Sequence, residues 1–78
     1  LPYEVRARIY SMLSRNEKAL KDYNEALRLN SGLPEIYNNR GNIYMRLGRL
    51  EEALGDYTQA INMSPVPQAA YYLNRAIV

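Results

Sequence analysis

The feature that most constrains this chain is an internal repeat of 34 residues. When residues 1–34 are aligned with residues 35–68, twelve positions carry the same residue, whereas chance in a chain of ordinary composition gives about two or three. A period of this length indicates a repeat protein, in which each unit buries its apolar face against its neighbours. The identical positions are Tyr3/Tyr37, Arg6/Arg40, Ile9/Ile43, Tyr10/Tyr44, Leu13/Leu47, Arg15/Arg49, Glu17/Glu51, Ala19/Ala53, Leu20/Leu54, Asp22/Asp56, Tyr23/Tyr57 and Ala26/Ala60.

Each unit is predicted to hold two helices, because its apolar residues recur three and four positions apart. In the second unit we expect helices at Pro34–Leu47 and Glu51–Met63, with Gly48 between them. In the first unit Asn16 is placed to cap the second helix with its side chain, and Gly32 suits the left-handed position that ends it. The sequence therefore predicts an all-α fold of five antiparallel-paired helices, with repeat 1 at residues 1–33, repeat 2 at 34–67 and a partial repeat 3 at 68–78.

Small residues and tyrosines explain how such helices would pack. Ala7, Gly41 and Ala76 hold one equivalent position in the three units, where a small side chain lets two helix backbones approach closely. The chain has eight tyrosines and no phenylalanine or tryptophan, and a tyrosine ring can fill a gap while its hydroxyl reaches the edge of the core. We therefore interpret the tyrosines mainly as packing residues rather than binding residues.

The composition argues against several classes of function. Ten Lys and Arg against eight Asp and Glu give a net charge of +2, and because the charges are interspersed they do not favour a nucleic-acid partner. Cysteine and histidine are absent, which removes thiolate zinc sites and the commonest general base. No apolar run approaches the roughly 20 residues that span a bilayer. We expect no cofactor, no metal and no membrane contact, and the cytoplasm is our default expectation for location.

The chain resembles the tetratricopeptide repeat (TPR) family over nearly its whole length. The departures are tyrosine where tryptophan is usual, Ser31 in place of the first unit's closing proline, and one extra residue before the third unit. The resemblance implies a right-handed α-α superhelix whose first helices line a concave groove that binds proteins or peptides, without catalysis. The residues of the second unit that fall at the family's offsets are Tyr37, Gly41, Tyr44, Ala53, Tyr57, Ala60 and Pro65.

Arginine stands at the position where the family usually has leucine, as Arg6, Arg40 and Arg75. In both complete units an aspartate follows sixteen residues later, Asp22 and Asp56. We predict that each pair bridges the two helices of its repeat, with the arginine stem packed on neighbouring tyrosines. The alternative is that these arginines face a ligand in the groove.

The resemblance also implies which side chains line the groove, and asparagine is prominent among them. An amide offers both a donor and an acceptor, so it can hold a peptide backbone without reading its sequence. Such repeated asparagines resemble the ladders in the repeat domains of some glycosyltransferases and transport receptors. The alternative is that they are hydrated polar filler, which we favour for Asn38. The predicted peptide-binding residues are Arg8, Asn38, Asn39, Asn42, Arg46 and Asn74, with Glu4, Val5, Met12, Glu35, Ala70, Leu73 and Ile77 on the same face.

A carboxylate clamp like that of chaperone adaptors matches this sequence poorly. If the clamp began in the first unit, only Asn39 would fit. If it began in the second, Asn42 and Asn74 would fit, but Asn38 stands where the family has lysine.

The leading hypothesis is therefore a protein–protein interaction module of a larger scaffold or adaptor, and not an enzyme. The alternatives are the substrate-selecting arm of a larger enzyme and a spacer between other domains. Because the sequence begins without methionine and ends at Val78 inside an apolar pattern, we expect a fragment of a longer protein. Tyr72, Leu73 and Ile77 would then lack a covering helix, so self-association through uncapped ends is expected.

Overall fold

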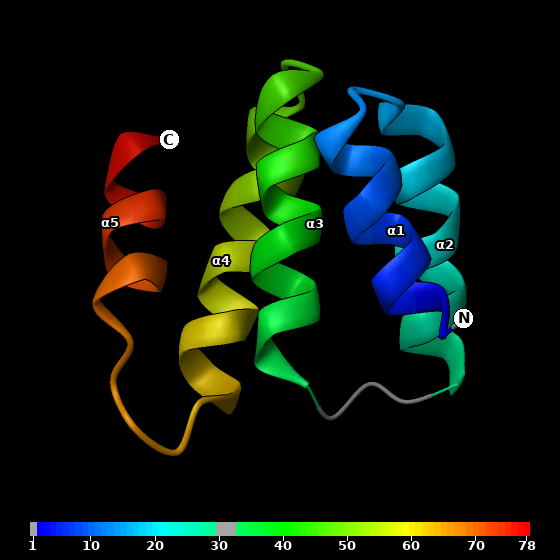
Figure 1. The fold of residues 1–78 in the computed structure, drawn as a ribbon. Coiled ribbons are helices and arrows are strands. Elements are labelled where there is room, and N and C mark those ends of the chain that lie inside the picture. Colours follow the sequence, from blue (N-terminus) through cyan, green and yellow to red (C-terminus); the bar gives the residue numbers. More distant parts are fainter. Residues whose placement is uncertain (1, 30–32) are drawn as a thin grey trace.

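The computed structural model describes residues 2–29 and 33–78 and shows the predicted all-α architecture. The helices of this described part pack as successive antiparallel pairs (Figure 1). The first helix packs mainly on the second and the third on the fourth, while the fifth lies against the fourth. A smaller contact between the second and third helices joins the two repeats. The five helices are α1 (Tyr3–Met12), α2 (Asn16–Leu29), α3 (Pro34–Arg46), α4 (Leu50–Met63) and α5 (Ala69–Ile77).

The turn after the first helix of each repeat has the same geometry, although one turn uses glycine and the other serine. Gly48 has a φ of 76° and Ser14 a φ of 59°, the left-handed region that glycine enters without a steric penalty. The next residue, Arg49 or Arg15, then donates its backbone N–H to the carbonyl five residues earlier, at 2.8 Å in both repeats. The predicted break at Gly48 is confirmed, and Ser14 reproduces it at a conformational cost.

The predicted side-chain cap at Asn16 is wrong. The helix α2 begins at Asn16 itself, and the Oδ1 atom of this residue is buried without a hydrogen-bond partner. The cap lies one residue earlier, because the carbonyl of Arg15 already accepts the N–H of Ala19 at 3.0 Å. The predicted helix end at Gly32 lies outside the described residues.

Close contact between paired helices depends on small residues facing tyrosine rings. Ala7, Ala19 and Ala53 are fully buried, and the ring of Tyr57 is only 2% exposed. A Cβ atom added to Gly41 would lie 2.8 Å from Cε1 of Tyr57, closer than two carbon atoms can pack. Glycine at this position therefore lets α3 rest directly on the ring that α4 presents.

The tyrosines range from exposed through half-buried to buried, so the packing interpretation holds for only part of the set. Tyr3 and Tyr72 are exposed on the surface. Each lies beneath an arginine one turn later, with the guanidinium carbon of Arg6 or Arg75 at 5.5 Å from the ring centroid, within the range of a cation–π contact. The tyrosines that are buried in the core are Tyr23, Tyr44 and Tyr57.

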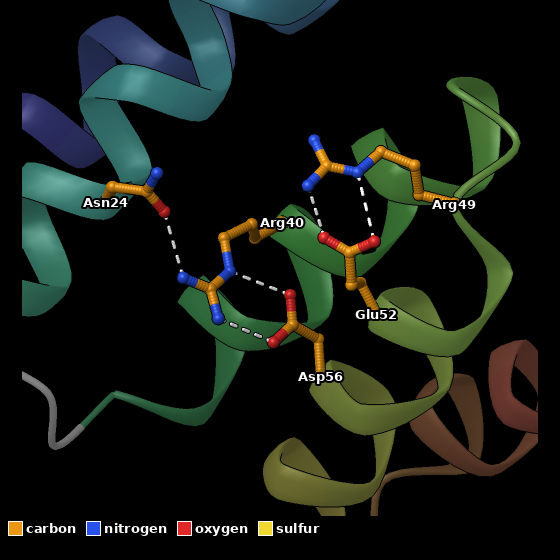
Figure 2. A network of polar contacts seen from close by, with 5 residues as sticks. All are labelled: Asn24, Arg40, Arg49, Glu52 and Asp56. Atoms are coloured by element: carbon orange, nitrogen blue, oxygen red, sulfur yellow. Dashed lines mark hydrogen bonds and ion pairs between the residues drawn. The ribbon is translucent and has the colours of Figure 1, made fainter.

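The predicted arginine–aspartate pairs bridge the two helices of each complete repeat, as Figure 2 shows for Arg40 and Asp56. In that pair Nε donates to Oδ2 at 2.8 Å and Nη2 to Oδ1 at 2.7 Å. In the first repeat the same two bonds join Arg6 to Asp22 at 2.7 and 2.9 Å. The alternative that these two arginines face the groove is wrong, because both forks are engaged by an aspartate of the following helix.

The second of these pairs also connects the two repeats. Nη1 of Arg40 donates to Oδ1 of Asn24 in α2 at 2.9 Å (Figure 2). The hydrogen bonds that Arg40 donates to Asp56 raise the pKa of the Arg40 guanidinium, and the equivalent bonds from Arg6 lower the pKa of Asp22. Each interaction therefore favours the charged form of the group and fixes the angle between neighbouring helices.

The helix α5 is held less firmly than the others. It contributes no buried side chain, and Tyr72, Leu73 and Ile77 are exposed. The self-association expected from such a surface stays a prediction.

Replacing Arg40 by methionine should destabilise the protein more than replacing Arg6. The Arg40 side chain is 20% exposed and that of Arg6 48%, and Arg40 also binds Asn24. Either replacement leaves a buried aspartate without its partner, since Asp22 is 4% and Asp56 6% exposed, but only Arg40→Met also removes a shielded guanidinium. For Arg40→Met we expect a loss of about 3 kcal/mol in the free energy of unfolding. Urea titration followed by circular dichroism measures both variants. An equal loss of stability in the two variants would show that the burial of the arginine does not determine how much each pair stabilises the protein.

Adding a methyl group at Gly41 should also destabilise the protein, by about 1–2 kcal/mol, because the Tyr57 ring must move in a packed core. Gly55 is the matched control, since it lies in α4 with no atom within 4 Å of an added Cβ. Gly55→Ala should instead raise stability by up to about 1 kcal/mol through helix propensity. Thermal unfolding of the two variants tests the contrast. A Gly41→Ala variant as stable as the parent would show that the Tyr57 ring can move without an energetic cost.

Candidate functional site

Two neighbouring pockets open between the first helices of successive repeats. The first, of about 160 Å³, lies between α1 and α3 and includes a tyrosine from α2. The second, of about 400 Å³, lies between α3 and α5 and includes a tyrosine from α4. We call the surface formed by both pockets the groove. The first pocket is lined by Arg8, Ser11, Met12, Tyr23, Asn39, Asn42 and Arg46, and the second by Asn42, Met45, Arg46, Tyr57, Asn74 and Ile77.

The second pocket is the first pocket repeated one unit later. Every residue that lines it is the repeat equivalent of a residue in the first, with a shift of 34 inside the complete repeats and 35 into the third. A ligand that lies along the groove would therefore meet two related environments in succession. The equivalent pairs are Arg8/Asn42, Ser11/Met45, Met12/Arg46, Tyr23/Tyr57, Asn39/Asn74 and Asn42/Ile77.

The structure brings five of the six predicted peptide-binding residues into these pockets. Arg8 and Asn39 line the first, Asn74 lines the second, and Asn42 and Arg46 line both. Five of the other residues predicted on this face also line pockets, whereas Ala70 and Leu73 do not line the pockets described here. The five are Met12 in the first pocket, Ile77 in the second, and Glu4, Val5 and Glu35 in a third.

Asn38 is the exception among the six. It is 9% exposed, and its Oδ1 atom accepts a hydrogen bond from Nδ2 of Asn74 at 2.9 Å. The two amides therefore join α3 to α5, and the Asn38 side chain is not open to a ligand. Its position also weighs against a carboxylate clamp that begins in the second repeat, where Asn38 would have to contact the ligand.

One groove asparagine, Asn42, is oriented by a tyrosine hydroxyl from a second helix. The hydroxyl of Tyr57 donates to Oδ1 of Asn42 at 2.5 Å, which leaves the amide NH₂ of Asn42 to face the pocket. Burial raises the pKa of the Tyr23 phenol, and a hydrogen bond with the side chain of Asn39 partly opposes this rise. Burial likewise raises the pKa of Tyr57. Both phenols thus stay protonated at neutral pH and act as fixed hydrogen-bonding groups.

Arg46 ties the two repeats together at the boundary of the pockets. Its Nη1 donates to the backbone carbonyl of Ser11 at 3.2 Å and its Nη2 to the Ser11 hydroxyl at 2.5 Å. A longer bond of 3.4 Å joins Nε to the carbonyl of Asn42. The guanidinium is therefore held across α1 and α3, although the residue is exposed.

The sequence analysis missed four residues of the groove. Ser11 and Met45 follow Arg8 and Asn42 by three positions, so helical spacing contains the signal that places them on the same face. The tyrosines of the two pockets were interpreted as core residues, and their rings are indeed buried. Only the position of the hydroxyl, which the sequence does not give, brings them into contact with the groove. The four missed residues are Ser11, Tyr23, Met45 and Tyr57.

A third pocket, of about 220 Å³, adjoins the first, and we include it in the groove from here on. It has more acidic than basic side chains in its lining. It is lined by Glu4 and Val5 of α1, Glu35 of α3, and Arg8 and Asn39, which it shares with the first pocket. Both glutamates lie in the first turn of their helices, where a carboxylate interacts favourably with the helix dipole. The groove therefore has acidic side chains beside the helix N-termini and basic ones further along.

These side chains supply hydrogen-bonding groups and charge. Among the described residues, no group of three or more His, Cys, Asp or Glu side chains is placed to hold a metal ion. In the same part of the chain, every helix is too short or too polar to cross a lipid bilayer.

Comparison with known protein families decides the classification. The TPR repeat model matches residues 7–48, and the tetratricopeptide repeat model matches residues 34–65. The chain belongs to the tetratricopeptide repeat family. TPR repeats are generally protein–protein interaction modules, and the family is typically non-catalytic. A comparison with curated proteins gives no match.

Removing the amide of Asn74 should loosen the last helix of this TPR chain. In the Asn74→Ala variant the buried Oδ1 of Asn38 loses its donor, which costs about 1–3 kcal/mol when a buried polar atom is left unpaired. We expect faster amide hydrogen exchange throughout α5, because that helix has no buried side chain of its own. Asn62→Ala, on the exposed face of α4, is the control. Unchanged exchange in α5 would show that the asparagine pair does not hold it.

Proposed function

We propose that the groove of this TPR chain binds an extended peptide segment of a partner protein. The observation that supports this most directly is the pair of repeat-equivalent pockets, each built from one tyrosine and from amide or guanidinium side chains of two successive first helices. An extended peptide presents side chains and backbone amides at regular intervals. A surface whose environment recurs once per repeat fits such a ligand better than it fits a compact small molecule.

The chemistry of the pockets suits a peptide backbone. The Asn42 amide is oriented by Tyr57, so its free donor is fixed before the ligand arrives. Such pre-ordering lowers the entropy lost on binding. Asn39 and Asn74 occupy the equivalent position in successive repeats and supply a further amide to each pocket.

Apolar side chains at the two ends of the groove add the area that such contacts need. Met12 of the first pocket is 84% exposed and Ile77 of the second 64%. Burial of apolar surface contributes about 25 cal/mol per Å², so both side chains gain by contact with a ligand. Since neither is buried in the protein, both can be truncated without disturbing its core.

Truncating these two side chains should weaken peptide binding by about tenfold, equivalent to 1.4 kcal/mol. Peptides would first be selected on the parent chain from a phage-displayed library of linear sequences and then synthesised with a fluorescent label. Fluorescence anisotropy would compare the Met12→Ala/Ile77→Ala double variant with the parent chain.

The control is the Leu54→Ala/Val66→Ala double variant. Its two side chains are 43% and 60% exposed and line none of the three groove pockets. It should bind like the parent. If the library yields no binder, or if both double variants bind the selected peptides equally well, the groove is not the binding surface.

A further inference from the structure

The first two pockets of the groove are lined by two arginines that form no ion pair among the described residues. Arg6, Arg28, Arg40 and Arg49 each pair with a carboxylate. Arg8 and Arg46 form no such pair in residues 2–29 and 33–78, and neither pocket has an aspartate or glutamate in its lining.

Arg46 is the better placed of these two cations. Its three hydrogen bonds go to neutral acceptors, the carbonyl and hydroxyl of Ser11 and the carbonyl of Asn42. A guanidinium has five N–H donors, so two remain free, and the full positive charge remains to attract an anion. The bonds to Ser11 hold the group in place, which reduces the entropy that an arginine otherwise loses when it binds.

We propose that the groove selects peptides with an internal aspartate or glutamate whose carboxylate binds Arg46. This inference rests on the proposed peptide-binding function and specifies its ligand. Arg46 lines both pockets, so a carboxylate bound to it would have the first pocket on one side and the second pocket on the other. The peptide chain continues in both directions from the anchored residue, which fits an internal side chain and not a chain terminus.

The acidic pocket next to the first fixes where the carboxylate can lie. Glu4 and Glu35 would repel a ligand carboxylate placed at that end. Glu35 and Arg46 are eleven residues apart on α3, about 16 Å along the helix axis, so the two charges act on different parts of the ligand. The charge pattern therefore favours an acidic side chain at Arg46 and disfavours one beside the helix N-termini.

The test uses peptides selected from the linear library, resynthesised with amidated C-termini so that only side chains supply carboxylates. We expect Asp and Glu to be enriched among the selected sequences. Replacing the enriched Glu by Gln, or Asp by Asn, should weaken binding to the parent chain by about tenfold, and higher salt should weaken the acidic peptide more than the neutral one.

A double-mutant cycle then assigns the interaction to Arg46. Arg46→Gln should weaken the acidic peptide by about tenfold and leave the neutral peptide nearly unchanged, while Arg46→Lys should retain part of the preference. Lys21→Gln removes the same charge from an exposed position on α2 outside the three groove pockets and should change neither affinity. Circular dichroism shows whether each variant is folded, and the comparison of the two peptides on the parent chain needs no variant.

Two different failures can be told apart. If selected peptides are neutral or basic, or if Arg46→Gln weakens the acidic and neutral peptides alike, the acidic preference is overturned. The groove would still bind peptides provided that the Met12→Ala/Ile77→Ala variant weakens them. If that variant also has no effect, the proposed function itself fails, and the assignment of Arg46 fails with it.

Discussion

The contact between Gly41 and the ring of Tyr57 determines more of this structure than any other single interaction. Because the helix backbone of α3 rests on the ring, the phenol extends past the core and its hydroxyl reaches Asn42. One side chain therefore sets the distance between two helices and orients an amide in the groove. A larger residue at position 41 would move α3 away from α4 and would carry the Asn42 amide with it. In this fold, the packing of the Tyr57 ring in the core therefore also determines the geometry of the groove.

The arginine–aspartate pairs act on a second aspect of the geometry, the orientation of helices within a repeat. A planar guanidinium that donates two parallel hydrogen bonds to one carboxylate tolerates little rotation of either partner. In an ordinary apolar contact the helices could slide by a fraction of a turn at small cost. Here the same shift would break the two hydrogen bonds between the guanidinium and the carboxylate. The Arg40 pair has the stronger effect because it is more buried than the Arg6 pair and extends to Asn24 of the preceding repeat.

The sequence predicted the helices and the arginine–aspartate pairs because both follow from a period of 34 residues and from helical spacing. It predicted the wrong cap at Asn16. Any polar residue near a helix start is a candidate cap in the sequence, and only the local backbone geometry decides which residue precedes the first turn. Asn38 and Asn39 show the limit most clearly. They are adjacent in sequence and identical in chemistry, yet one is buried against α5 and the other lines a pocket. Successive residues of a helix lie about 100° apart around its axis, so the two side chains face different neighbours. Which side chain is covered depends on how α5 packs, and therefore on the interface between repeats.

The interface between successive repeats includes three polar contacts. Arg40 with Asn24, Arg46 with Ser11, and Asn38 with Asn74 each join one repeat to the next, while α2 and α3 contact each other less extensively than the paired helices within either repeat. Hydrogen bonds near the surface exchange with water at little net cost, so successive repeats can change their relative tilt more easily than paired helices can separate. A ligand carboxylate that binds the two free N–H donors of Arg46 would leave its bonds to Ser11 in place, so the ligand would contact a group that already joins the two repeats.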